Sequence, residues 1–110
     1  IYVDILHHHK YHNNYDYQKS ILLVNKIPFY DSGFVILHEN EKLVSPISVV
    51  YLERYKTTED LKIRLDVVSD KLQCIVGQTE QANIPFGMAQ SPELWDYADR
   101  VDTMKFLEEI

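Results

Sequence analysis

Cysteine and glycine are scarce in this 110-residue sequence, which contains one Cys and three Gly. Because a lone cysteine, Cys74, has no partner for a disulfide within the chain, we expect a reducing compartment and a cytoplasmic location. Three glycines are too few for the glycine-rich loops that cradle phosphates, and the sequence contains no GxGxxG, Walker or GxSxG pattern. We therefore expect no self-contained active site and no catalytic residue in this chain.

Positive charge and long apolar runs are also lacking. The chain has 11 Lys and Arg against 17 Asp and Glu, a net charge of −6, and its cations are scattered singly. Because nucleic acid is bound by clustered cations, we expect no nucleic-acid partner. The longest apolar run, Ile21–Val24, is far shorter than the roughly 20 residues of a membrane-spanning helix, so we expect no membrane span.

The remaining composition is that of a folded protein. Hydrophobic residues make up 45% of the chain and charged residues 25%, values that argue against disorder. A chain of this length has room for one modest core. We predict a single α/β segment over residues 1–110.

Two helices are predicted in the N-terminal part of the chain. Residues 1–12 contain no Gly or Pro and predict a first helix, which the Asn13-Asn14 pair then interrupts. Three apolar residues recur with the i, i+4, i+7 spacing of a buried helical stripe: Tyr17, Ile21 and Val24. This spacing predicts a second helix that ends near Asn25, before Pro28.

Three β-rich runs predict strands at Phe34–Leu37, Ile47–Leu52 and Leu72–Val76. The first run follows a turn at Asp31-Ser32-Gly33. The second is apolar enough to be covered on both faces, as in a parallel sheet.

A helix is predicted between the second and third strands. Residues 57–60 form an N-cap cluster with acids in the first turn, and Leu61, Leu65 and Val68 follow at helical spacing. Apolar residues at 61, 63, 65 and 67 also alternate as in a strand, but the capping cluster favours a helix. The order strand, helix, strand predicts a right-handed crossover, and hence an α/β fold with a short mixed or parallel sheet flanked by helices.

The chain changes character after Gly77. Residues 78–90 have little periodicity and predict a loop. Ser91-Pro92-Glu93 predicts the start of a helix with Pro at the first helical position. Asp102 predicts the cap of a last helix that carries Met104, Leu107 and Ile110.

Two groups of residues suggest chemistry but are more simply explained by structure. His8 and His12 are four residues apart, as a zinc-binding pair on a helix would be, but zinc takes three or four ligands and no third ligand is recognisable. A polar helix face is the simpler interpretation, and no metal site is predicted. Cys74 falls within a predicted buried strand, where cysteines are usually inert.

A loop near residue 86 has the residues of a pocket wall. It combines an aromatic ring at Phe86, a backbone open to close approach at Gly87 and a side-chain amide at Gln90. A surface turn with Phe86 packed inward is the structural alternative. The following run, residues 95–99, mixes aromatic and acidic side chains, and its structural alternative is an amphipathic helix whose aromatic residues enter the core.

Five segments, read in order, carry a resemblance to a known family: residues 31–34, 45–49, 72–76, Phe86-Gly87 with Gln90, and 94–104. They resemble the C-terminal part of bacterial acyl-CoA reductases, which are relatives of the fatty-acid reductase of bacterial bioluminescence in the aldehyde dehydrogenase superfamily. The most specific element is the Trp-Asp-Tyr-Ala-Asp-x-Val-Asp-Thr-Met run of residues 95–104. The resemblance implies the C-terminal part of an aldehyde-dehydrogenase-like catalytic domain, cut from a larger reductase.

The same resemblance implies a cofactor and a substrate. The cofactor is NADPH, with contacts from Glu41 and Pro46, where Glu41 lies one residue before the position of the family glutamate and Pro46 matches the family proline. The substrate is acyl-CoA, with Phe86, Gly87 and Gln90 near the acyl pocket. The nucleophilic cysteine and most of the nucleotide site are implied to lie upstream of this chain, and the last helix is implied to be a packing or homo-oligomer element.

Three hypotheses about function follow. The first is a cytoplasmic reductase that converts acyl-CoA to fatty aldehyde through a cysteine thioester, with this chain as its C-terminal portion. The second is a non-catalytic interaction module whose acidic surface and exposed aromatic residues bind a partner protein. The third is a histidine-based metal-binding protein, which would carry stoichiometric zinc.

Overall fold

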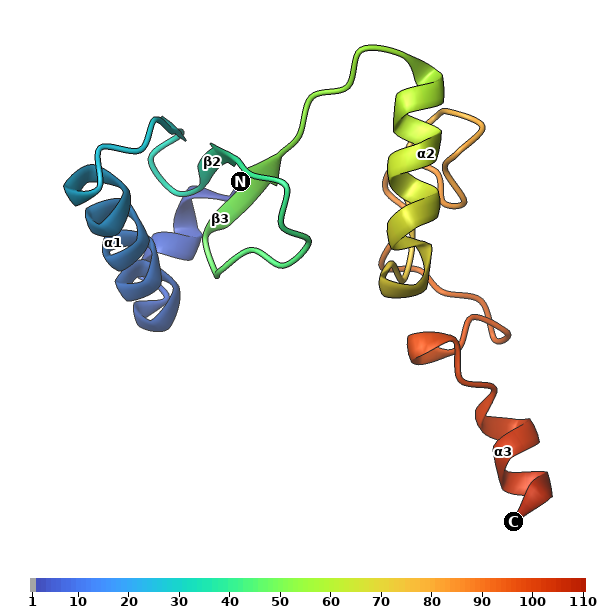
Figure 1. Cartoon of the computed structure of the whole chain (residues 1–110). Helices are drawn as coiled ribbons and strands as arrows, with labels where there is room; N and C mark the ends of the chain where they lie inside the picture. Colours follow the sequence, from blue (N-terminus) through green and yellow to red (C-terminus); the bar gives the residue numbers. More distant parts are fainter. Residues whose placement is uncertain (1) are drawn as a thin grey trace. The chain divides into compact units, whose positions relative to one another are not determined.

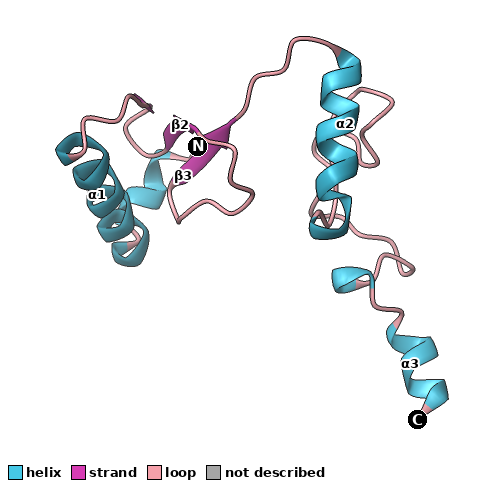
Figure 2. Ribbon diagram, viewed as in Figure 1, coloured by secondary structure: helices cyan, strands magenta, loops and turns pink. Residues whose placement is uncertain are grey.

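The computed structural model describes residues 2–110, apart from the side chain of Arg100, and the chain divides into two compact units, Ile1–Arg54 and Tyr55–Ile110 (Figure 1). The elements of the first unit are the 3-10 helix η1 (Val3–His7), α1 (His9–Val24), β1 (Tyr30–Asp31), β2 (Ile36–Glu39) and β3 (Val49–Leu52). The elements of the second are α2 (Thr58–Val68), η2 (Ser69–Lys71), η3 (Ala98–Arg100) and α3 (Thr103–Glu109), joined by long loops (Figure 2).

The first unit contains a small mixed sheet, which confirms the α/β class with a short mixed sheet. The strand order is β1-β2-β3, with β1 and β2 antiparallel and β2 and β3 parallel. Ile36 pairs with Val49, and the register continues to Glu39 opposite Leu52. Nothing in the architecture ties this sheet to an aldehyde dehydrogenase domain.

The parallel pair is not the predicted one. It joins β2 to β3 through residues 40–48 without a helix, whereas the prediction placed a helical crossover between residues 47–52 and 72–76. Ser48, in the left-handed region at φ 71°, turns the chain into β3, and its carbonyl accepts the Ile36 N–H at 2.9 Å. Among the described residues, the run 72–76 forms one isolated bridge, Val76 to Ile84, and Ile75 bonds to the Asn83 side chain and backbone instead of to a further strand.

One continuous helix replaces the two predicted N-terminal helices. The Asn13-Asn14 pair lies inside α1, and the Asn14 side chain donates to the Lys10 carbonyl at 2.8 Å instead of ending the helix. The predicted end near Asn25 is confirmed. Burial of Tyr15 and Leu22 against the sheet outweighs the few tenths of a kcal/mol that asparagine costs in a helix. Residues 3–7 form the separate 3-10 helix η1, and His8 caps α1.

The core of the first unit lies between α1 and the sheet. Its buried side chains are Tyr15, Leu22, Ile36 and Val49, and Ile36 is fully buried. Along β3, Val49 is buried but Val50 is 48% exposed, so the strand is covered on one face and not on both as predicted.

The second unit is held mainly by local contacts. A capping box begins α2: the Thr57 hydroxyl accepts the Asp60 N–H, and the Asp60 carboxylate accepts the Thr57 N–H. Asp102 caps α3 by accepting the Lys105 N–H at 3.0 Å, so both predicted caps are confirmed. Among the described residues of this unit, Val68 is the one buried apolar side chain.

The helix predicted to begin at Ser91-Pro92-Glu93 does not form. The Glu93 N–H donates to the Asp96 carboxylate at 2.9 Å, and the Asp96 N–H donates to the Glu93 carbonyl at 3.1 Å. A short acidic side chain that binds nearby backbone competes with a helix in this way. Within residues 2–110, no helix is long and apolar enough to cross a membrane.

Candidate functional site

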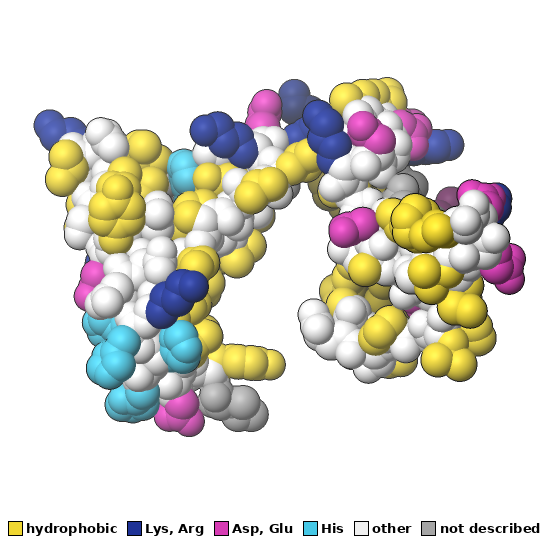
Figure 3. Space-filling model, turned by 90° about the horizontal axis from the view of Figure 1, so that it is seen from below, with side chains coloured by type: hydrophobic (Ala, Val, Ile, Leu, Met, Phe, Trp, Pro, Cys, Tyr) yellow, Lys and Arg dark blue, Asp and Glu magenta, His cyan; other side chains and the backbone are white. Residues whose placement is uncertain are grey.

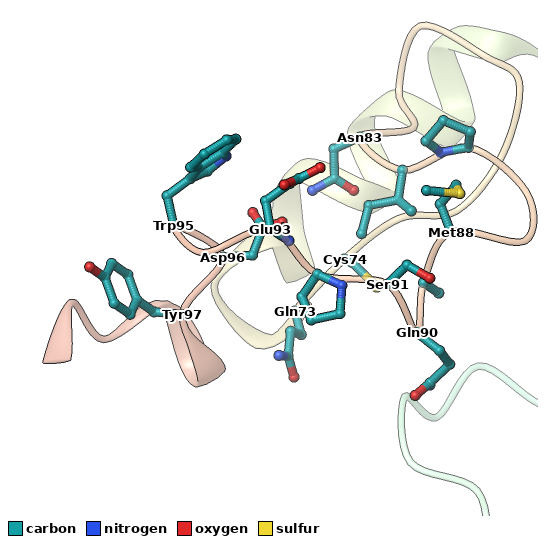
Figure 4. A pocket seen from close by; sticks show the side chains of 14 residues that line it. Gln73, Cys74, Asn83, Met88, Gln90, Ser91, Glu93, Trp95, Asp96 and Tyr97 are labelled. Atoms are coloured by element: carbon teal, nitrogen blue, oxygen red, sulfur yellow. Dashed lines mark hydrogen bonds between the residues drawn. The ribbon is translucent and has the colours of Figure 1, made fainter.

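An open pocket of about 860 Å³ lies within the second unit, between residues 73–74 and the loop 83–97 (Figure 4). Its wall contains the amides of Gln73, Asn83 and Gln90 together with the thiol of Cys74 and the ring of Trp95. The apolar part comes from Ile84, Pro85, Met88 and Pro92. The pocket therefore offers both hydrogen-bonding groups and apolar surface to one ligand.

Asn83 holds the two sides of the pocket together. Its Oδ1 accepts the Ile75 N–H at 2.7 Å, its own N–H donates to the Ile75 carbonyl at 2.9 Å, and the Ile84 N–H donates to the same carbonyl at 3.1 Å. The Gly77 N–H closes the bridge by donating to the Ile84 carbonyl at 3.0 Å. In the part of the chain that the structure describes, the Nδ2 amino group of Asn83 has no partner, so it remains a donor on the pocket wall.

Two tight turns shape the rest of the wall. The Met88 N–H donates to the Pro85 carbonyl, and the Ser91 N–H donates to the Met88 carbonyl at 3.0 Å. Gly87 lies in the left-handed region at φ 81°, which a glycine adopts without strain. The turn at Glu93 and Asp96 follows and brings Trp95 to the pocket.

The pocket is acidic at one end. Glu93 and Asp96 line it, and none of the described side chains around it is a Lys or Arg. Desolvation raises the pKa of the Tyr97 phenol, and the nearby Asp102 carboxylate raises it further. Tyr97 therefore stays protonated at neutral pH and acts as a hydrogen-bonding group.

The predicted substrate-pocket residues are placed differently from one another. Gln90 is part of the pocket wall, although its side chain extends away from the other labelled side chains in Figure 4. Phe86 is 65% exposed, and neither Phe86 nor Gly87 lines the pocket. The surface turn of the structural alternative is present, with the Met88 N–H bonded to the Pro85 carbonyl, but Phe86 is not packed inward.

The predicted cofactor residues belong to the first unit. Glu41 and Pro46 lie in the connection between β2 and β3. A glutamate carboxylate can accept hydrogen bonds from ribose hydroxyls, but residues 40–48 contain no glycine and no helix N-terminus to receive a pyrophosphate. These residues do not by themselves fit NADPH.

The sequence predicted part of the pocket wall, in the loop that ends at Gln90, but not Asn83 or Glu93. Asn83 and Glu93 carry no motif, and only the tertiary bridge to Ile75 reveals the role of Asn83. Cys74 was expected in a buried strand, but it lies in irregular backbone, is partly exposed and lines the pocket. Asparagine favours turns, but this preference does not predict the bridge from Asn83 to Ile75.

His8 and His12 both make contacts along α1. The Nδ1 atom of His8 accepts the Tyr11 N–H, and His12 contacts Asp16 at 3.0 Å. Figure 3 shows histidine side chains in cyan gathered on the first unit. Within the described residues, no group of three or more His, Cys, Asp or Glu side chains is arranged to hold a metal ion.

A second polar cluster connects α1 to the turn after β1. The Asp31 carboxylate accepts the Tyr15 hydroxyl at 2.6 Å and the Gly33 N–H at 2.9 Å, and it pairs with Lys19 at 2.7 Å. Burial and the bond to Asp31 raise the pKa of Tyr15. The polar groups of this cluster bond to one another and join the helix to the sheet, so the cluster stabilises the fold.

Comparisons with protein-family models, with curated proteins and with solved structures find no match to this chain.

Proposed function

We propose that this chain is the C-terminal portion of a cytoplasmic, NADPH-dependent acyl-CoA reductase that produces fatty aldehyde. The observation that carries the proposal is the pocket of the second unit, which contains Gln90 and three residues of the run 95–104 on which the resemblance depends: Trp95, Asp96 and Tyr97. An open pocket is expected if this chain forms one wall of a larger active site.

The role proposed for this chain is to bind substrate. In the complete reaction, a cysteine thiolate would attack the acyl carbonyl and coenzyme A would leave as a thiolate. NADPH held by other parts of the parent protein would supply the hydride that releases the aldehyde and the cysteine thiolate. The nucleophile and the hydride donor belong, in this proposal, to parts of the parent protein outside these residues. No bond-breaking step is assigned to Cys74, Glu41 or Pro46.

Acyl-CoA-dependent oxidation of NADPH tests the proposal. The intact parent protein and this 110-residue chain are assayed side by side with acyl-CoAs of several chain lengths, and the aldehyde is identified by mass spectrometry. We expect the parent protein to oxidise NADPH and to release an equimolar amount of aldehyde, and the 110-residue chain alone to do neither. A parent protein that is inactive with every acyl-CoA tested refutes the proposal.

A protein-interaction module is the second candidate, because the second unit exposes large apolar side chains. Leu94 is 93% exposed, Ile110 84% and Trp95 71%. In a parent reductase these side chains would be covered by other parts of the enzyme or by a second copy of it. A parent protein that lacks reductase activity but forms a stable complex with a partner protein, measured by light scattering, would favour the interaction module.

A further inference from the structure

We propose that the loop pocket binds the neutral pantetheine arm and thioester of acyl-CoA, and excludes its phosphate groups. This inference rests on the proposed function and goes beyond it by assigning one part of the substrate to one set of residues.

Charge decides which part of coenzyme A fits. The adenosine end carries several phosphate charges, whereas the pantetheine arm is uncharged. The pocket places Glu93 and Asp96 on its wall, with no Lys or Arg among its described lining side chains. Carboxylates repel phosphates, so the anionic end of the substrate is held elsewhere.

The polar groups match those of an amide. The pantetheine arm contains two amides, each with one carbonyl acceptor and one N–H donor. The Nδ2 group of Asn83 is a donor for an amide carbonyl, because its Oδ1 is already committed to the Ile75 N–H. The Glu93 carboxylate, which lines the same pocket, is an acceptor for an amide N–H.

The apolar lining accounts for the rest of the ligand. Ile84, Pro85, Met88 and Pro92 present aliphatic surface, and the Trp95 ring lies at the outer edge of the pocket (Figure 4). The pantetheine arm has a geminal dimethyl group, and the thioester leads into an alkyl chain. The pocket lining is thus both polar and apolar, as a ligand that combines amides with aliphatic groups requires.

Trp95 supplies an internal probe, because it is the one tryptophan of the chain and it lines the pocket. The 110-residue chain is titrated with S-octanoyl pantetheine while Trp95 fluorescence is followed, and separately with adenosine 3′,5′-bisphosphate. We expect a saturable change with the thioester that persists at high salt, and none with the bisphosphate. A response to the bisphosphate that equals the response to the thioester overturns the proposal.

Asn83→Asp is the sharpest variant. It keeps an oxygen to accept the Ile75 N–H, so the backbone bridge is retained, but it replaces the Nδ2 donor by a further negative charge. We expect S-octanoyl pantetheine to bind about tenfold more weakly. Asn13→Asp makes the same chemical change on an exposed residue of α1 and should leave binding unchanged.

Glu93→Lys is a second variant that tests the same proposal if Asn83→Asp unfolds the loop. The backbone N–H of residue 93, which donates to Asp96, is unaffected by this change. We expect a new response to adenosine 3′,5′-bisphosphate and weaker thioester binding. Unchanged ligand preference in both variants overturns the proposal.

The two proposals fail in different ways. If the parent protein is an active reductase but the thioester does not change the Trp95 fluorescence of the 110-residue chain, only the pantetheine assignment is refuted. A parent without reductase activity refutes the proposed function, whatever Trp95 reports.

Discussion

Lys19 on α1 pairs with Asp31 at the end of β1, with 2.7 Å between Nζ and Oδ2. The Tyr15 hydroxyl donates to the other carboxylate oxygen at 2.6 Å. Two groups of the helix therefore hold one carboxylate of the sheet. The hydrogen bond from Lys19, followed by that from Tyr15, lowers the pKa of Asp31 from 3.8 to about 2.

This pKa predicts how the stability of the first unit depends on pH. A lowered pKa in the folded state stabilises the fold above pH 4, and the contribution is lost as the pH falls toward about 2. At about 1.4 kcal/mol per pKa unit the shift gives roughly 2 kcal/mol, which solvent screening of this partly exposed pair reduces to about 1 kcal/mol. Urea unfolding from pH 7 to pH 2 measures it.

Asp31→Asn is the matched variant. Its free energy of unfolding at pH 7 should be about 1 kcal/mol lower than that of the wild type, and it should change less as the pH falls to 2. An equally steep acid dependence in Asp31→Asn would assign the effect to other carboxylates.

The fully buried Ile36 is expected to dominate the core of the first unit. Ile36→Ala should lower the free energy of unfolding by about 2 to 5 kcal/mol, because it leaves a cavity between α1 and the sheet. Ile36→Val, which removes one methylene, should cost about 0.5 to 1.5 kcal/mol. Chemical denaturation of both variants measures the two losses of unfolding free energy. Two small and equal losses would contradict the burial of Ile36 in this core.

Thr57 is expected to determine whether α2 is stable. Thr57→Ala removes the hydroxyl that accepts the Asp60 N–H and should cost about 1 kcal/mol. Thr58→Ala, at the next position, leaves the cap intact and serves as the control. Far-ultraviolet circular dichroism during thermal unfolding should show an earlier loss of helix for Thr57→Ala only, and identical curves would argue against the capping box.

Cys74 is expected to be dispensable for the reaction, although it lines the pocket. In the parent protein, Cys74→Ala should retain acyl-CoA-dependent oxidation of NADPH, because the proposal places the nucleophile elsewhere. Mass spectrometry should find no acyl group on Cys74 after incubation with acyl-CoA. Acylation of Cys74 together with loss of activity in Cys74→Ala would identify this residue as the nucleophile.

Local signals in the sequence predicted both helix caps, although the helix start predicted at Ser91-Pro92-Glu93 was wrong. The capping residues Thr57 and Asp102 lie where their side chains accept backbone N–H groups. These features depend on residues three positions apart, so a sequence contains all that determines them.

Features that depend on distant partners were predicted poorly. The run 72–76 has the composition of a strand, but a strand needs a partner, and Ile75 bonds to Asn83 instead. The Asn13-Asn14 pair was expected to break the helix, yet Tyr15 beside it is buried against the sheet. Asn83 could not be predicted as a pocket residue, since its role depends on a bridge that no sequence motif encodes.

The most direct test of the central claim is the Michaelis constant for acyl-CoA of the parent protein, measured by NADPH oxidation for the wild type, Asn83→Asp and Asn13→Asp. We predict activity in all three, with the constant raised about tenfold in Asn83→Asp and unchanged in Asn13→Asp. An active wild type with equal constants in all three would show that the pocket takes no part in binding substrate, and an inactive wild type would contradict the reductase itself.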